Sequence, residues 1–226
     1  MKRYLSVFAS VLSLALSIGM ASAADLSRPP PITKAPAFVP PYYNWTGFYV
    51  GINGGGGWGT SNWNPVPGSF NTSGGLVGGT IGYNWQVGQF VWGLEGDADW
   101  SDIKGSTTGT FASCGPGIVC TTKNDFLSTI RGRLGFAADR WMPYITGGLA
   151  IGNIKASNGF GSVDQTNAGW TAGGGIEFAL ASNWTAKVEY LYVDLGNVNC
   201  SVTCAPLTNN ASFTANVVRG GFNLRF

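Results

Sequence analysis

The chain has 226 residues, of which 35 are glycine and 9 are tryptophan, and only 11% are charged. The glycine content argues against a helical protein, because glycine destabilises helix interiors, and the aromatic residues argue against a disordered chain. Setting aside Lys2 and Arg3 lowers the formal net charge from +2 to zero, with 11 basic and 11 acidic residues left, which excludes a bulk electrostatic attraction to nucleic acid.

Residues 1–23 have the pattern of a secretory signal peptide. Lys2 and Arg3 precede a short apolar stretch, and Ala21, Ser22 and Ala23 supply the small residues of a cleavage site. We therefore expect cleavage after Ala23. No later stretch is long and apolar enough for a spanning helix, so a membrane location would require strands.

Residues 24–44 are rich in proline and are predicted to form an extended periplasmic lead segment. Proline lacks a backbone N–H, so this segment cannot build a strand ladder. Two interpretations stay open for it. It is either a spacer before the first strand or a docking peptide for a periplasmic partner.

Residues 45–226 are predicted to form an all-β fold, an eight-stranded antiparallel up-and-down transmembrane β-barrel. The runs alternate with period two, so successive side chains point to opposite faces of a sheet. Each run is long enough for a tilted strand to cross the hydrocarbon core of a bilayer. The expected strands are residues 45–58, 74–85, 90–100, 125–137, 143–154, 169–180, 184–195 and 213–226.

The predicted connections alternate between short and long. Residues 86–89, 138–142 and 181–183 are short links, whereas the links after the first, third, fifth and seventh strands are long and polar. Outer-membrane barrels have short periplasmic turns and long extracellular loops. Tryptophan and tyrosine residues near the strand ends fit interfacial girdles, with a stacking platform for nucleic acid or sugar as the weaker alternative.

The inward faces of the predicted strands carry the charged residues of the barrel. A register slip of one residue would move these charges into lipid, at about 2–4 kcal/mol for each basic side chain at the midplane. Paired carboxylates can perform acid–base chemistry, but a compensated structural network is the favoured interpretation. The predicted lumen network comprises Glu95, Asp97, Asp99, Arg131, Arg133, Glu177, Lys187, Glu189, Arg219 and Arg225, and Asp125 is also expected to point inward.

The sequence contains no histidine, which removes imidazole metal sites and serine–histidine or cysteine–histidine nucleophile systems. We therefore predict no enzymatic activity, no catalytic residue, no cofactor and no metal. Cys114, Cys120, Cys200 and Cys204 fall in predicted external loops. Local disulfides between Cys114 and Cys120 and between Cys200 and Cys204 are the most economical pairing, and a four-thiolate metal site is disfavoured.

Several segments carry a family resemblance. WTGFYVGINGGGGWG, FVWGLEGDADWS, KVEYLYVDLG and the terminal VVRGGFNLRF resemble alphaproteobacterial small outer-membrane proteins of the RopB type, within the OmpA-like eight-stranded barrel superfamily. The resemblance implies location in the bacterial outer membrane, contact with its lipid and lipopolysaccharide, and insertion by the barrel assembly machinery. It also implies that Phe226 is an assembly signal.

Three functions follow from these observations. The first is a structural barrel that maintains envelope integrity, with its loops exposed as a surface antigen. The second is a porin-like channel for small solutes, although eight strands leave an interior that side chains just fill. The third is an adhesin or ligand-binding surface built from the loops.

Overall fold

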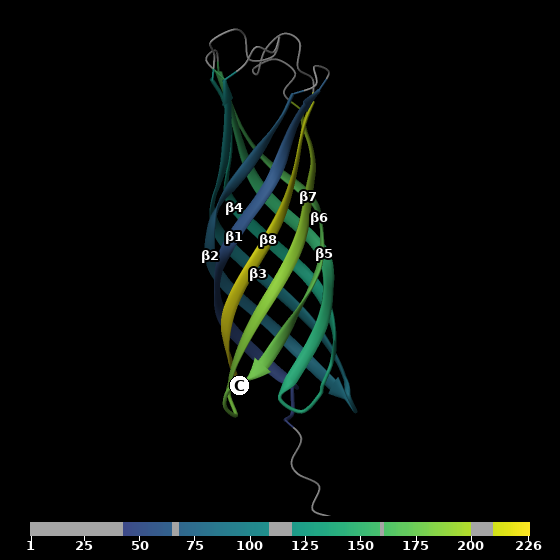
Figure 1. Ribbon diagram of the computed structural model, residues 1–226. Helices are drawn as coiled ribbons and strands as arrows, with labels where there is room; N and C mark the ends of the chain where they lie inside the picture. The colour runs from purple at the N-terminus through teal and green to yellow at the C-terminus, as the bar shows by residue number, and fades with distance from the viewer. Residues whose placement is uncertain (1–42, 65–67, 109–118, 159–160, 200–209) are drawn as a thin grey trace, which may run out of the picture. The chain divides into compact units, whose positions relative to one another are not determined.

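The computed structural model describes residues 43–64, 68–108, 119–158, 161–199 and 210–226. They form one closed barrel of eight strands in sequence order, which confirms the predicted fold class (Figure 1). The predicted signal peptide and nearly all of the proline-rich segment lie outside the described residues. The strands are β1 (Gly47–Asn64), β2 (Gly68–Val87), β3 (Phe90–Thr108), β4 (Val119–Phe136), β5 (Trp141–Asn158), β6 (Gly161–Ala179), β7 (Trp184–Asn199) and β8 (Asn210–Arg225).

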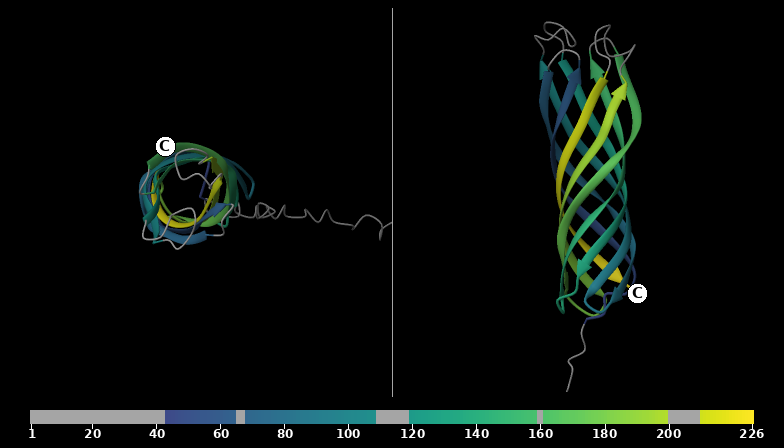
Figure 2. Two further views of the ribbon diagram at one scale, coloured as in Figure 1. Left: turned by 90° about the horizontal axis from the view of Figure 1, so that it is seen from above. Right: turned by 90° about the vertical axis from the view of Figure 1, so that its right-hand side faces the viewer.

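Antiparallel pairing of β1 with β8 closes the barrel. This pairing runs from Tyr49 opposite Arg225 to Asn64 opposite Asn210, and the view along the axis shows a complete ring of strands (Figure 2). Phe226 adds a backbone hydrogen bond of 2.9 Å from its N–H to the carbonyl of Phe48. Closure leaves no sheet edge, so the backbone groups of every strand can pair within the barrel.

Three short turns join the strands at one end of the barrel, which we call the turn end. They connect β2 to β3, β4 to β5 and β6 to β7, as the sequence predicted. Gly88 and Asp139 have φ angles of 62° and 55°, the left-handed conformation that tight hairpin turns require. Phe226 also lies at the turn end, beside β1.

The strands extend beyond the predicted boundaries at the opposite end, which we call the far end. β3, for example, continues to Thr108 although its apolar alternation stops at Trp100. Most of the residues predicted as long loops are therefore paired strand, and the remaining connections fall outside the described residues. The sequence pattern detected only the apolar part of each strand, whereas backbone pairing continues with polar side chains outward.

The outward face of the barrel carries an apolar band between two aromatic margins. Trp58, Trp100 and Trp170 are about half exposed or more on the far-end side of this band. Trp85, Trp92, Trp141 and Trp184 are similarly exposed on the turn-end side. Aromatic girdles of this kind mark the two interfaces of a membrane-spanning barrel. Among the described residues, no helix is long and apolar enough to cross a membrane.

Candidate functional site in the barrel lumen

The barrel interior contains a layer of ionisable side chains that are almost completely buried. Inward positions of β3, β4, β6, β7 and β8 supply them, because these residues occupy the face opposite to the apolar band. We call this set the charged layer. Its members are the carboxylates Glu95, Asp97, Asp99, Glu177 and Glu189 and the cations Arg131, Arg133, Lys187 and Arg219.

Arg131 lies at the centre of the charged layer. Its Nη2 atom is 2.6 Å from Glu95 Oε1 and 2.8 Å from Asp97 Oδ2, both on the neighbouring strand β3. Its Nη1 atom is 2.9 Å from Glu189 Oε2 on β7. One guanidinium group therefore links two walls of the barrel through charge-assisted hydrogen bonds, which are roughly twice as strong as neutral ones.

Arg219 makes a second linkage from β8. Its Nη1 is 2.6 Å from Asp99 Oδ2, its Nη2 is 2.9 Å from Asp97 Oδ2, and its Nε is 2.9 Å from Glu189 Oε1. Lys187 on β7 adds a bond of 2.8 Å to Glu95 Oε2 on β3. The layer therefore cross-links strands that are not neighbours in the sheet.

Arg133 forms the part of the charged layer nearest to the turn end. Its Nη2 is 2.6 Å from Glu177 Oε2, and its guanidinium carbon lies 4.1 Å from the ring centroid of Tyr144. Two tyrosines that the sequence analysis did not single out complete this region. Tyr49 donates a hydrogen bond of 2.8 Å to Glu95, and Tyr144 donates one of 3.1 Å to Glu189.

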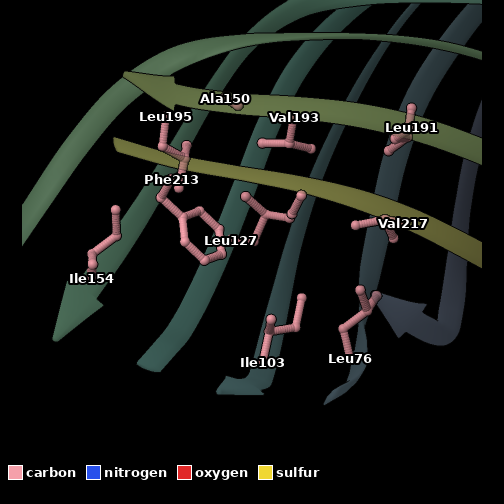
Figure 3. Close-up of a cluster of buried hydrophobic side chains, with 11 residues drawn as sticks. Leu76, Ile103, Leu127, Ala150, Ile154, Leu191, Val193, Leu195, Phe213 and Val217 are labelled. Carbon is pink, nitrogen blue, oxygen red and sulfur yellow. The ribbon is translucent and has the colours of Figure 1, made fainter. Parts of the chain in front are cut away.

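An apolar cluster fills the lumen on the far-end side of the charged layer. Figure 3 shows its side chains converging from several strands of the barrel. These residues occupy inward positions, and their exposure is 5% or less. A membrane barrel of the porin type has a polar interior instead. The far-end cluster comprises Leu76, Ile103, Leu127, Ala150, Ile154, Leu191, Val193, Leu195, Phe213, Ala215 and Val217.

A second apolar cluster closes the lumen at the turn end. Trp45, which precedes β1, is 1% exposed and packs with Val91, Met142 and Tyr144. Its backbone N–H donates to Gln86 Oε1 at 2.7 Å and its indole N–H to the carbonyl of Asp139 at 3.2 Å. The charged layer is therefore covered by apolar side chains on both sides.

Two charged residues lie elsewhere than predicted. Arg225 is at the turn-end rim, where it stacks 4.4 Å from the ring centroid of Tyr43 and donates to the carbonyls of Asn44 and Ser182, so it is not part of the charged layer. Asp125 points outward, because the β4 pairing shifts between Asn124 and Phe126. A β-bulge at this position reverses the side-chain alternation that the sequence pattern assumed.

The predicted disulfides remain untested, and one of the four cysteines lies elsewhere than predicted. Cys114, Cys200 and Cys204 lie outside the described residues. The backbone of Cys120 belongs to β4, opposite Thr107, rather than to a loop. In the part of the chain that the structure describes, no group of three or more histidine, cysteine or acidic residues is arranged to hold a metal ion.

Above the far-end aromatic margin, outside the apolar band, lysines and aspartates form an outward chain of ion pairs. Asp125 lies 2.8 Å from Lys123 and 2.7 Å from Lys155, and hydrogen bonds from these two lysines hold the pKa of Asp125 below its usual value. Lys123 also lies 3.5 Å from Asp102, which is paired with Lys104 at 3.0 Å. We call this chain, together with Asp164 and its contact with Lys155, the outer collar.

The sequence as a whole is similar to known outer-membrane proteins. A family model described as the outer membrane protein beta-barrel domain matches residues 11–226. The 31 kDa outer-membrane immunogenic protein of Brucella melitensis biotype 1 is 37% identical, over 97% of this chain and 98% of that protein. The 22 kDa outer membrane protein of Rhizobium leguminosarum bv. viciae is 32% identical, over 83% and 81% of the two chains.

The solved structures that resemble this barrel are more distant in sequence. Neisserial surface protein A superimposes with a TM-score of 0.49 at 14% identity, and the alignment covers 80% of this chain and 98% of that one.

Proposed function

This chain belongs to the outer membrane protein β-barrel family, and from that premise we propose that it is a closed, non-enzymatic barrel that contributes to envelope integrity. Its location is the bacterial outer membrane. The observation that carries the proposal is the filled lumen, in which a cross-linked charged layer lies between two apolar clusters. Such an interior stabilises the barrel and places buried side chains of the described residues across the lumen at three successive levels.

We further propose that the connections at the far end are displayed on the cell surface as antigenic loops. The Brucella relative is named an outer-membrane immunogenic protein, which supports surface exposure of the corresponding region here. At the turn end short turns join the strands close to the apolar band, whereas at the far end the strands continue beyond it, and in outer-membrane barrels the end with the short turns faces the periplasm. The far end would then face outward, where antibodies have access.

The closed-barrel proposal predicts negligible ion conductance. Wild-type protein reconstituted into planar bilayers should give no steady single-channel current, because the charged layer and the two apolar clusters place buried side chains in the lumen. A porin of known conductance, inserted under the same conditions, serves as the positive control. A stable open current from wild-type monomers would contradict the proposal and favour the solute-channel alternative.

The proposed role in envelope integrity is tested by a measurement in cells. Cells that lack the barrel should become more sensitive to detergents, and wild-type protein should restore resistance. If resistance is unchanged by the loss of the protein at normal expression, the integrity role is wrong even where the barrel is closed.

A further inference from the structure

The outward surface of the barrel carries a groove of about 500 Å³ at the far-end margin of the apolar band. Trp100, Phe126, Asn153 and Thr166 stand opposite one another in successive strand pairs from β3 to β6, and they form one row across the groove. The volume lies in the range of sites for small molecules. Because the row spans two aromatic and two polar residues, the groove lies where the apolar band meets the polar surface.

The floor and the rim of this groove differ in chemistry. Trp100, Phe126 and Ile151 supply an apolar floor and are 73%, 38% and 40% exposed. Asp125 and Lys155 supply a charged rim on the side away from the band. An occupant that satisfies both parts needs an apolar tail and a polar headgroup.

The charged rim depends on the bulge in β4. Asn124 pairs with Ile154 and Phe126 with Asn153, so Asp125 has no partner across the β4–β5 ladder. The bulge turns Asp125 outward, directly beside Lys155 at 2.7 Å. β-Bulges often re-aim a side chain at functional positions. Without the extra residue, Asp125 would point into the lumen, as the sequence pattern suggested.

The rim offers both donors and acceptors to a headgroup. The side chain of Lys155 is 49% exposed, and its ammonium group lies 2.7 Å from Asp125 and 3.7 Å from Asp164. An ammonium group has three donors, so Lys155 can direct its third donor to a phosphate oxygen while keeping its contacts with Asp125 and Asp164. Asp125, Asn153 and Thr166 supply acceptors for sugar hydroxyl groups. A phosphorylated sugar matches this mixture better than a simple anion does.

We propose that this groove binds a phosphorylated glycolipid of the outer leaflet, with an acyl chain on the aromatic floor and a phosphate on Lys155. The far end of the barrel faces the outer leaflet if the short turns are periplasmic. A free phosphate ion would make no contact with the apolar floor, and a neutral lipid would offer no anionic oxygen to Lys155. The glycolipid therefore satisfies more of the groove than either alternative.

A second groove on the barrel surface provides an internal comparison. It has a volume of about 560 Å³, and its outward side chains, including Trp85, Trp92, Leu134 and Ile145, are all apolar. It lies at the turn-end margin of the band and lacks a charged rim. We expect acyl chains to bind in this second groove without a headgroup contact. Selectivity for phosphorylated over unphosphorylated lipid is therefore expected at the far-end groove.

The test measures binding of lipid A to the full chain, purified from outer membranes and exchanged into a neutral detergent, by native mass spectrometry. Lys155→Gln should weaken binding of bis-phosphorylated lipid A by about tenfold, as expected for the loss of one charge-assisted hydrogen bond. Lys104→Gln is the matched control, since Lys104 belongs to the outer collar but does not line the groove. We expect less than about a twofold effect from it.

Three further measurements decide the assignment. Lipid A without its phosphates should bind the wild-type protein as weakly as the phosphorylated form binds Lys155→Gln. Inorganic phosphate should not compete, and competition would reassign the site to a soluble anion. Equal binding of the two lipids, or equal effects of the two lysine substitutions, would overturn the proposal. Heat-modifiable mobility on gels verifies that each variant is folded, and none of these outcomes depends on the conductance of the barrel.

Discussion

Asp99 gives the charged layer one more carboxylate than it has cations among the described residues. Its closest cation is Arg219, which also binds Asp97 and Glu189. Burial of an unbalanced charge is costly, whereas a fully paired network is tolerated. Individual positions in the layer therefore differ in their contribution to stability, although all of them are buried to a similar extent.

Replacing Arg131 should destabilise the barrel more than any single carboxylate change at the edge of the layer. Arg131→Ala removes a cation shared by Glu95, Asp97 and Glu189 and leaves the layer with two more carboxylates than cations, and removing one partner from a buried ion-pair network costs about 3–5 kcal/mol. Asp99→Asn, the comparison variant, removes the excess carboxylate and should change the free energy of unfolding by less than about 1 kcal/mol. Urea unfolding in detergent measures both.

A similar loss of stability in the two variants would mean that the charge balance of the layer does not matter. No loss in Arg131→Ala would mean that its contacts with the three carboxylates contribute nothing.

At the residue scale, alternation in the sequence predicted which side chains point inward but not their height along the barrel axis. Arg225 obeys the alternation, yet it lies at the rim, because it is too close to the chain end to reach the layer. Tyr49 and Tyr144 were missed as partners of the carboxylates. Their inward positions were a usable signal, since a buried tyrosine hydroxyl usually needs a hydrogen-bond partner.

At the scale of single strands, the inward and outward glycines of β1 have different roles. A Cβ atom at Gly55 would lie 2.6 Å from Arg219 Cα and still closer to the carbonyl of Val218, both on β8. A Cβ atom at Gly56 would meet nothing nearer than the carbonyl of Gly74 at 3.7 Å. Inward glycines therefore allow β1 and β8 to approach at the seam, and outward ones do not serve this purpose.

Gly55→Ala should consequently impair closure of the barrel, and Gly56→Ala should not. The added methyl group at Gly55 collides with the backbone of β8, which cannot move away without breaking the ladder between the two strands. We expect a cost of about 1–3 kcal/mol, the usual range for overpacking. Thermal unfolding followed by circular dichroism compares the two variants, and equal midpoints would show that the seam has room for a side chain.

The number and the order of the strands could be predicted from the sequence, because period-two alternation is strong within the apolar band. The strand ends could not, since the alternation fades where the outward residues become polar, as it does after Trp100 in β3. The bulge at Asp125 also escaped prediction. A single extra residue in a polar stretch leaves no signal in the hydrophobic pattern, although it moves Asp125 to the outward face while Leu127 and the inward residues after it keep their predicted face.

At the scale of the whole molecule, Phe226 lies at the point where the barrel closes. Phe226 is 75% exposed, and its N–H forms one bond to the carbonyl of Phe48. The side chain itself therefore adds little packing within the barrel. An effect of Phe226 on the amount of protein in the membrane would point to recognition during insertion.

Deleting Phe226 should lower the amount of heat-modifiable barrel in outer-membrane fractions, while refolding of the same variant in detergent should be nearly unchanged. The control is Phe90→Ala, which removes an exposed aromatic ring from the same end of the barrel but leaves the terminal residue intact. Normal insertion of the deletion variant would refute an assembly role. Failure to refold in detergent would indicate a structural role instead.

The anchoring of Trp45 has a mechanical consequence. Residues just before β1 are bound to three different hairpins: Trp45 contacts Gln86 at the end of β2 and Asp139 between β4 and β5, and Tyr43 contacts Ser182 between β6 and β7. Tension applied to the chain ahead of Tyr43 would thus be distributed over several hairpins at once. It would load these contacts in parallel, whereas a free first strand would peel from its neighbours one hydrogen bond at a time. A pulling force on the amino-terminal segment would therefore have to break several of these contacts together before it could separate β1 from the barrel.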